Sequence, residues 1–188
     1  EKKRLVAEIK SLLANFEPRL QIGLYQGWPK GHKLDFIIEK NTELGVARIE
    51  VLITERSIPH PDQQTIKRRR QRWQQKALAA ARQSHRLRVP PVNGPLELTT
   101  ALPLLKPDTL LLVPWEQERK RTLKAVLEAS KAKGQEMAVL IGPEGGLSPV
   151  EIDFVSGYGG VPVSLGPRIL RTETAGIVCL TAIMYAFG

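Results

Sequence analysis

A strand, a glycine-rich loop and a capped helix can be recognised in residues 137–151, which spell MAVLIGPEGGLSPVE. The first five residues are all apolar, which is typical of a strand buried on both faces of a parallel sheet. Ser148 has the position of a helix N-cap, with Pro149 at the first helical position and Glu151 three residues after the cap. These features predict a strand–loop–helix unit whose loop carries three glycines.

Strands and helices alternate outward from this unit. Apolar or alternating runs predict further strands at residues 20–25, 48–53, 109–113 and 161–165. Helical spacing and capping residues predict helices at 34–44, 62–86, 119–133 and 172–187. Residues 90–95, with three prolines and a glycine, predict the main linker-like stretch. This order indicates an α/β fold with a largely parallel sheet.

A second unusual loop, residues 165–175, spells LGPRILRTETA and lies between the last predicted strand and the last predicted helix. Ligands of open parallel sheets bind beyond the carboxyl ends of the strands, where both loops are expected. The first loop is neither a P-loop nor a dinucleotide fingerprint, because it lacks both spacings. Two structural alternatives stay open, namely that the glycines only form a tight turn and that Thr172 is only an N-cap.

Charge is distributed unevenly along the 188 residues, which carry a net charge of +9. Residues 1–94 hold 19 basic and 9 acidic side chains, whereas residues 95–188 hold 9 and 10. The excess positive charge therefore lies in the first half, which suggests that this half faces a polyanion. The alternative is a solvated, charged helix face.

Several protein classes are excluded by composition. The single cysteine, Cys179, lies in an apolar run, rules out an intrachain disulfide and is expected in the core. Three scattered histidines and one cysteine show no metal-ligand spacing. The longest apolar stretch, residues 175–187, is too short for a membrane helix. No signal peptide is visible. We therefore expect a cytoplasmic protein with neither a membrane nor a metal partner.

The two loop motifs together resemble the RsmE family of small-subunit ribosomal RNA methyltransferases, which methylate a uridine at N3. That family belongs to the SPOUT class of S-adenosylmethionine-dependent enzymes. The upstream segments KGHKLDFIIEK at 30–40 and TELGV at 42–46, Arg72-Trp73 and the basic segment 80–90 are also similar. The chain departs from the family at Ala79 and Arg82, where acidic residues are usual.

The resemblance covers roughly residues 20–188 and implies a SPOUT methyltransferase domain, with a Rossmann-like, mostly parallel sheet and a C-terminal trefoil knot. It also implies a homodimer whose active site draws on both subunits. Residues 1–19 would then be the remnant of an N-terminal PUA-like RNA-binding domain, or a linker. Because the chain begins with Glu1 instead of Met, we expect a processed or truncated product.

Site roles follow from this resemblance and from the chemistry of methyl transfer to a uridine nitrogen. Negative charge develops on the uracil as N3 loses its proton, so Arg171, then Arg168, is the candidate to stabilise it and Glu173 the candidate base or organiser. Alternatively, both arginines bind RNA phosphate and Glu173 only pairs with one of them. Beside the two loops, a third wall of the cofactor site is expected from Pro114, Trp115 and Glu116. The residues expected to contact S-adenosyl-L-methionine, mostly through backbone atoms, are Ile141, Gly142, Pro143, Glu144, Gly145, Gly146, Leu165, Gly166, Ile169, Leu170 and Thr172.

The basic helix is expected to hold ribosomal RNA of the small subunit through phosphate contacts, which give affinity without sequence specificity. Its candidate RNA contacts are Lys67, Arg68, Arg69, Arg70, Arg72 and Arg86. Two other functions remain open from the sequence. One is a different SPOUT enzyme acting on transfer RNA or on a ribose 2′-hydroxyl, and the other is a non-catalytic RNA-binding ribosome-assembly factor.

Overall fold

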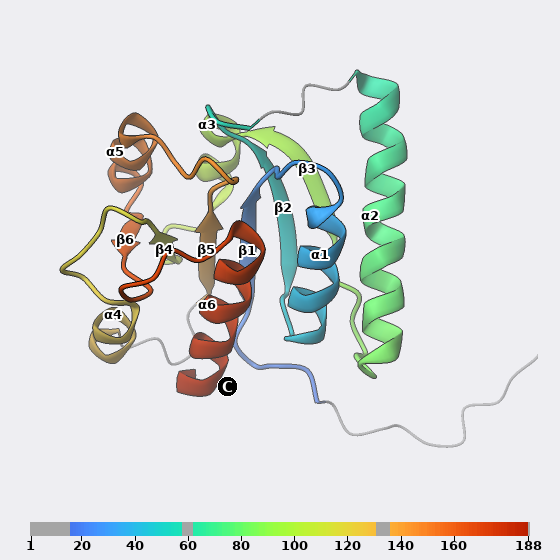
Figure 1. Ribbon diagram of the computed structural model, residues 1–188. Helices are drawn as coiled ribbons and strands as arrows, with labels where there is room; N and C mark the ends of the chain where they lie inside the picture. Colours follow the sequence, from blue (N-terminus) through green and yellow to red (C-terminus); the bar gives the residue numbers. More distant parts are fainter. Residues whose placement is uncertain (1–15, 58–61, 131–135, 188) are drawn as a thin grey trace, which may run out of the picture.

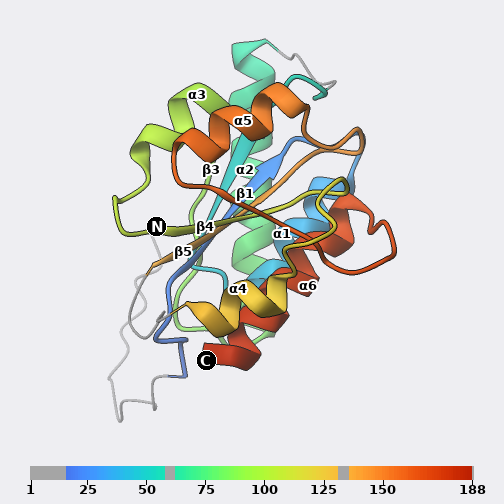
Figure 2. The same ribbon diagram turned by 90° about the vertical axis from the view of Figure 1, so that its left-hand side faces the viewer.

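The computed structural model describes residues 16–57, 62–130 and 136–187, which form one sheet covered by helices on both faces (Figures 1 and 2). Within these residues the sheet has six strands in the order β3-β2-β1-β5-β4-β6, and every pairing is parallel. The strands are β1 Ile22–Gly27, β2 Arg48–Ile53, β3 Val92–Glu97, β4 Leu110–Pro114, β5 Met137–Ile141 and β6 Val161–Val163. The predicted α/β class with a largely parallel sheet is confirmed.

Two hydrophobic cores lie on opposite faces of this sheet. Helices α1 Lys33–Glu43, α2 Gln63–Gln83, α4 Leu123–Ala129 and α6 Thr172–Phe187 contribute buried side chains to one core. Helices α3 Leu98–Ala101 and α5 Pro149–Gly157, with the 3-10 turn Leu102–Leu104, contribute to the other. Strand β5 sends Val139 into the first core and Leu140 into the second. Its unbroken apolar sequence therefore follows from burial on both faces.

The structure confirms several of the predicted helix caps. The Asp62 side chain accepts a hydrogen bond from the Thr65 N–H at 2.9 Å and starts α2. Ser148 and Glu151 form the predicted capping box of α5. Gly45 follows α1 with a φ of +92°, the left-handed conformation that ends many helices at glycine.

The linker expected at residues 90–95 is wrong, because β3 begins within this stretch, at Val92. Strand β3 lies at an edge of the sheet, where proline is tolerated because one side of the strand needs no hydrogen-bond donor. Gly94 has a φ of +93°, and a Cβ there would lie 2.2 Å from the Val51 carbonyl oxygen. The glycine thus permits a close backbone approach inside a strand pairing.

The start predicted for the helix at 119–133 is wrong, because α4 begins four residues later, at Leu123. Its N-cap Thr122 accepts a hydrogen bond from the Ala125 N–H at 3.2 Å. Just before it, the Arg121 carbonyl accepts the Ser164 N–H at 2.7 Å, which holds this segment beside the residue that follows β6. Helix α4 ends at Ala129, and residues 131–135, at the expected end, lie outside the described residues.

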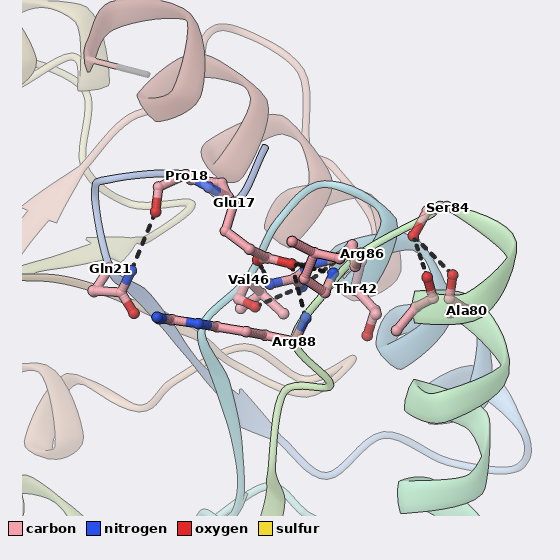
Figure 3. A network of polar contacts seen from close by, with 11 residues as sticks. Glu17, Pro18, Gln21, Thr42, Val46, Ala80, Ser84, Arg86 and Arg88 are labelled. Carbon is pink, nitrogen blue, oxygen red and sulfur yellow. Dashed lines mark hydrogen bonds and ion pairs between the residues drawn. The ribbon is translucent and has the colours of Figure 1, made fainter. Parts of the chain in front are cut away.

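Arg86 has an internal structural role, which corrects its assignment to the RNA-binding set (Figure 3). Its guanidinium lies 2.7 Å from the Glu17 carboxylate, and the two side chains are 8% and 6% exposed. It also donates to the carbonyl oxygens of Thr42 and Val46 at 3.0 and 2.8 Å. Because this guanidinium is buried and its donors are engaged inside the fold, we remove Arg86 from the RNA-binding candidates.

Glu17 joins the beginning of the described chain to the turn after α2. Its carboxylate accepts the backbone N–H groups of Leu87 and Arg88 at 2.8 and 2.9 Å, besides the Arg86 guanidinium. Burial acts to raise the pKa of Glu17, but the hydrogen bonds and the charge of Arg86 outweigh it and lower the pKa. Glu17 therefore packs on the main domain, although it lies within the predicted remnant 1–19. Residues 1–15 of that remnant lie outside the described residues.

Candidate functional site

The two predicted loops meet at the carboxyl ends of β4, β5 and β6, around a cavity of about 510 Å³. All of the residues predicted for S-adenosylmethionine binding and for catalysis line this cavity, as do the third-wall residues Pro114, Trp115 and Glu116. Lys33, Glu118 and Arg119 line it as well and were not predicted. The structure thus brings the predicted set into one place, while the role of each residue stays a prediction.

The glycine-rich loop is folded tightly on itself and against its neighbours. A Cβ on Gly142 would lie 2.8 Å from the Gly146 carbonyl carbon, a backbone atom that cannot move aside easily. Gly146 has a φ of +69°, and its Cβ would lie 2.9 Å from a carboxylate oxygen of Glu116. Both positions therefore require glycine for the loop to keep this shape.

Two consecutive hydrogen bonds connect β1, this loop and the start of α6. Gln26, at the end of β1, donates from Nε2 to the Thr172 hydroxyl at 2.9 Å, and that hydroxyl donates to the Gly142 carbonyl oxygen at 2.6 Å. Thr172 is therefore not the N-cap expected of it, since α6 begins at Thr172 itself and the Arg171 carbonyl accepts the N–H groups of Thr174 and Ala175. Gln26 was not predicted, and its only signal was an amide inside an otherwise apolar strand.

Two basic residues from other parts of the chain bind the glycine-rich loop. The Lys33 ammonium group lies 2.7 Å from the Glu144 carboxylate, which also accepts the Lys30 N–H at 3.1 Å. Burial acts to raise the pKa of Glu144, but these hydrogen bonds outweigh it and lower the pKa. Arg56, after β2, donates to the Gly145 carbonyl oxygen at 2.6 Å. The Glu144 side chain thus fixes the loop, which leaves its backbone to face the cavity.

The second loop presents exposed side chains at the cavity. Arg168 and Arg171 are both exposed, and Ile169 is 79% exposed. Two buried polar atoms, Oε2 of Glu173 and Nε1 of Trp115, have no hydrogen-bond partner among the described residues. Both residues line the cavity. Buried polar groups are normally hydrogen-bonded, so these two atoms suit a site completed by a polar ligand.

Helix α2, with the basic residues, lies at the β3 end of the sheet, away from the cavity loops (Figure 1). The side chains of Lys67 and Arg68 are exposed. Arg69 lies 5.3 Å from the centre of the Trp28 ring, Arg70 donates to the Gly94 carbonyl oxygen, and Arg72 pairs with Asp35. Three of these basic residues thus contact the fold, whereas Lys67 and Arg68 are exposed and make no hydrogen bond or ion pair through their side chains among the described residues.

In the described ranges, no helix has the length and hydropathy needed to cross a membrane. The same ranges contain no group of three or more His, Cys, Asp or Glu side chains that could hold a metal ion. Cys179 is fully buried in α6, and burial raises the pKa of its thiol to about 12. It lies in the core, as expected.

Comparison with known proteins agrees with this geometry. A family model described as an RNA methyltransferase domain matches residues 16–184, a range that includes the whole sheet and both cavity loops. The fold and the cavity are therefore those of an RNA methyltransferase domain.

Similar proteins define the family more narrowly. The chain is 36% identical to the ribosomal RNA small subunit methyltransferase E of Bacillus subtilis, over 91% of this chain and 68% of that protein. It is 32% identical to the crystal structure of the same-named enzyme from Neisseria gonorrhoeae bound to S-adenosyl methionine, with a TM-score of 0.81 over 89% of this chain and 67% of the other. A Legionella pneumophila methyltransferase in complex with S-adenosylmethionine gives 34% identity and a TM-score of 0.85, over 94% and 70%. This chain belongs to the ribosomal RNA small subunit methyltransferase E family, which confirms the resemblance found in the loop motifs.

Proposed function

We propose that this protein transfers a methyl group from S-adenosylmethionine to N3 of a specific uridine in small-subunit ribosomal RNA. The observation that carries the proposal is that both predicted loops line the same cavity. Supporting it, relatives named ribosomal RNA small subunit methyltransferase E share the family, and two solved relatives hold S-adenosylmethionine.

The residues that line the cavity suit such a cofactor chemically. Gly142 and Gly146 keep the first loop free of side chains where a ligand would meet the backbone. Ile141, Leu165 and Leu170 supply apolar surface that suits an adenine ring. The unpartnered Nε1 of Trp115 and Oε2 of Glu173 supply a donor and an acceptor. When bound, S-adenosylmethionine supplies the methyl group, and the protein has to align that group with the nucleophile.

Arg171 and Arg168 lie at the cavity with exposed side chains. In the proposal, Arg171 stabilises the negative charge that spreads onto the uracil carbonyl oxygens as N3 loses its proton, with Arg168 as the second candidate. Glu173 accepts that proton or orients one of the arginines.

The partners in this proposal are the RNA of the small ribosomal subunit and a second copy of the chain. Lys67 and Arg68 on α2 contact RNA phosphates. Two exposed apolar side chains support a homodimer, Ile169 beside the cavity and Tyr185 on α6, which are 79% and 94% exposed. The trefoil knot and the shared active site implied by the family resemblance remain part of the proposal, as does the cytoplasmic location expected from the composition.

Two measurements test the proposal. A thermal shift with S-adenosylmethionine separates it from a non-catalytic assembly factor, because a bound ligand raises the melting temperature by mass action. Radiolabelled methyl transfer to small ribosomal subunits that lack the modification then tests the activity. We expect stabilisation and label in the RNA. The absence of both would overturn the proposal, and label in transfer RNA would favour the other SPOUT activity.

A further inference from the structure

Gln26 is a completely buried amide located where the two cavity loops leave the sheet. It is 0% exposed, and in the pairing of β1 with β5 it lies opposite Ile141, the residue at which the glycine-rich loop begins. Gln26 itself does not line the cavity. Any effect on a ligand must therefore pass through the residues that it contacts.

The direction of each hydrogen bond in this cluster is determined by the Gly27 carbonyl oxygen, which can only accept. It lies 3.0 Å from Nε2 of Gln26, so the amide nitrogen must face it and donate. The second N–H of Nε2 then donates to the Thr172 hydroxyl at 2.9 Å. The hydroxyl, acting as acceptor there, directs its own hydrogen to the Gly142 carbonyl oxygen at 2.6 Å.

We propose that Gln26 is a positioning residue for the cofactor site, which sets the separation of the two cavity loops through the Thr172 hydroxyl. The chain of bonds ties β1 to the glycine-rich loop at Gly142 and to the start of α6 at Thr172. Among the described residues, the Thr172–Gly142 bond is the side-chain hydrogen bond that joins the two loops directly. This inference rests on the proposed S-adenosylmethionine site.

A purely structural role explains the amide poorly. Oε1 of Gln26 is buried and has no partner among the described residues, so the side chain loses part of the stability that its two donated bonds provide. An apolar side chain of similar size, such as leucine, would avoid this cost at the same place in the core. The feature that leucine cannot supply is the donor that orients the Thr172 hydroxyl.

The test measures S-adenosylmethionine affinity by titration calorimetry on the full chain, with melting temperatures to verify folding. We expect Thr172→Val and Gln26→Leu each to raise the Kd by about tenfold, the effect of losing one buried hydrogen bond and leaving its partner unsatisfied. Thr172→Ser keeps the hydroxyl and should stay within about twofold of wild type. Thr174→Val makes the same change as Thr172→Val at an exposed position two residues away and should also leave the Kd unchanged.

A double variant supplies a second criterion. Because both residues act through one hydroxyl, Gln26→Leu combined with Thr172→Val should weaken binding no more than the weaker-binding single variant does. Wild-type affinity in folded Thr172→Val, or equal losses in Thr172→Val and Thr172→Ser, would overturn the inference. If Gln26→Leu fails to fold, Gln26→Met, which has a similar length and no donor, takes its place, and wild-type affinity in that folded variant would likewise overturn the inference. If the wild-type protein itself does not bind, the proposed function fails and not the positioning role.

Discussion

Replacing Glu17 by alanine tests the internal role assigned to Arg86. The variant removes a carboxylate whose side chain is 6% exposed and leaves the Arg86 guanidinium, whose side chain is 8% exposed, without its counterion. It also leaves the N–H groups of Leu87 and Arg88 without the oxygen that accepted their hydrogen bonds. Breaking one side of a buried ion pair costs about 3–5 kcal/mol, because the remaining charge stays buried without a counterion. We expect a loss of that size in the free energy of unfolding at pH 7.

Urea denaturation followed by circular dichroism measures this loss. The control is Glu128→Ala on α4, which removes a carboxylate 3.7 Å from Lys124 in an exposed pair, with exposed fractions of 66% and 83%. Such surface pairs contribute only about 0.3–0.5 kcal/mol. If Glu17→Ala destabilised the protein no more than this control, the buried pair would not hold the chain as described, and Arg86 would return to the RNA-binding candidates.

Acid adds an independent check on the same pair. The pKa of Glu17 is lowered in the fold from its ordinary value of 4.5, so its ionised carboxylate stabilises the protein above that value. This contribution disappears as the pH falls through the lowered pKa. The stability difference between wild type and Glu17→Ala should therefore shrink below pH 4.5, and a difference that grew there would contradict the assigned pairing.

Three further predictions concern the core and the site. Cys179, with a pKa of about 12 and no exposure, should resist thiol reagents at pH 8 in the native protein and react once urea unfolds it; rapid native labelling would place it elsewhere. Arg171→Ala should lower kcat about 100- to 1000-fold while the Kd for S-adenosylmethionine stays near wild type, and an unchanged kcat would remove it from catalysis. The double variant Lys67→Ala and Arg68→Ala should reduce the slope of log affinity for ribosomal RNA against log salt by about 1.5, a change not expected for the exposed Lys124→Ala.

The strands at the centre of the sheet were predictable because a short apolar run is typical of a strand that is buried on both faces. Met137–Ile141 is buried on both faces and was found with its exact bounds. Strand β3 was missed because Gly94 and Pro95 are signals of a loop, and only its edge position makes them compatible with a strand. Local sequence does not say which strand will lie at an edge.

The cavity residues were predictable because they are clustered in two short motifs. The contacts that hold distant segments together were not, because Gln26, Arg56 and Glu17 act through partners between 69 and 146 residues away in the sequence. A run of positive charge also does not reveal which of its members turns inward. Arg86 does so because the carboxylate of Glu17 and two carbonyl oxygens meet it there.

Mapping the modified atom tests the central claim most directly. Small-subunit ribosomal RNA without the modification would be incubated with the protein and S-adenosylmethionine, digested to nucleosides and fragments, and analysed by mass spectrometry. We expect a single new N3-methyluridine at one position, formed only when S-adenosylmethionine is present. A methyl group on a ribose hydroxyl or on another base, or no incorporation by protein that binds S-adenosylmethionine, would contradict it.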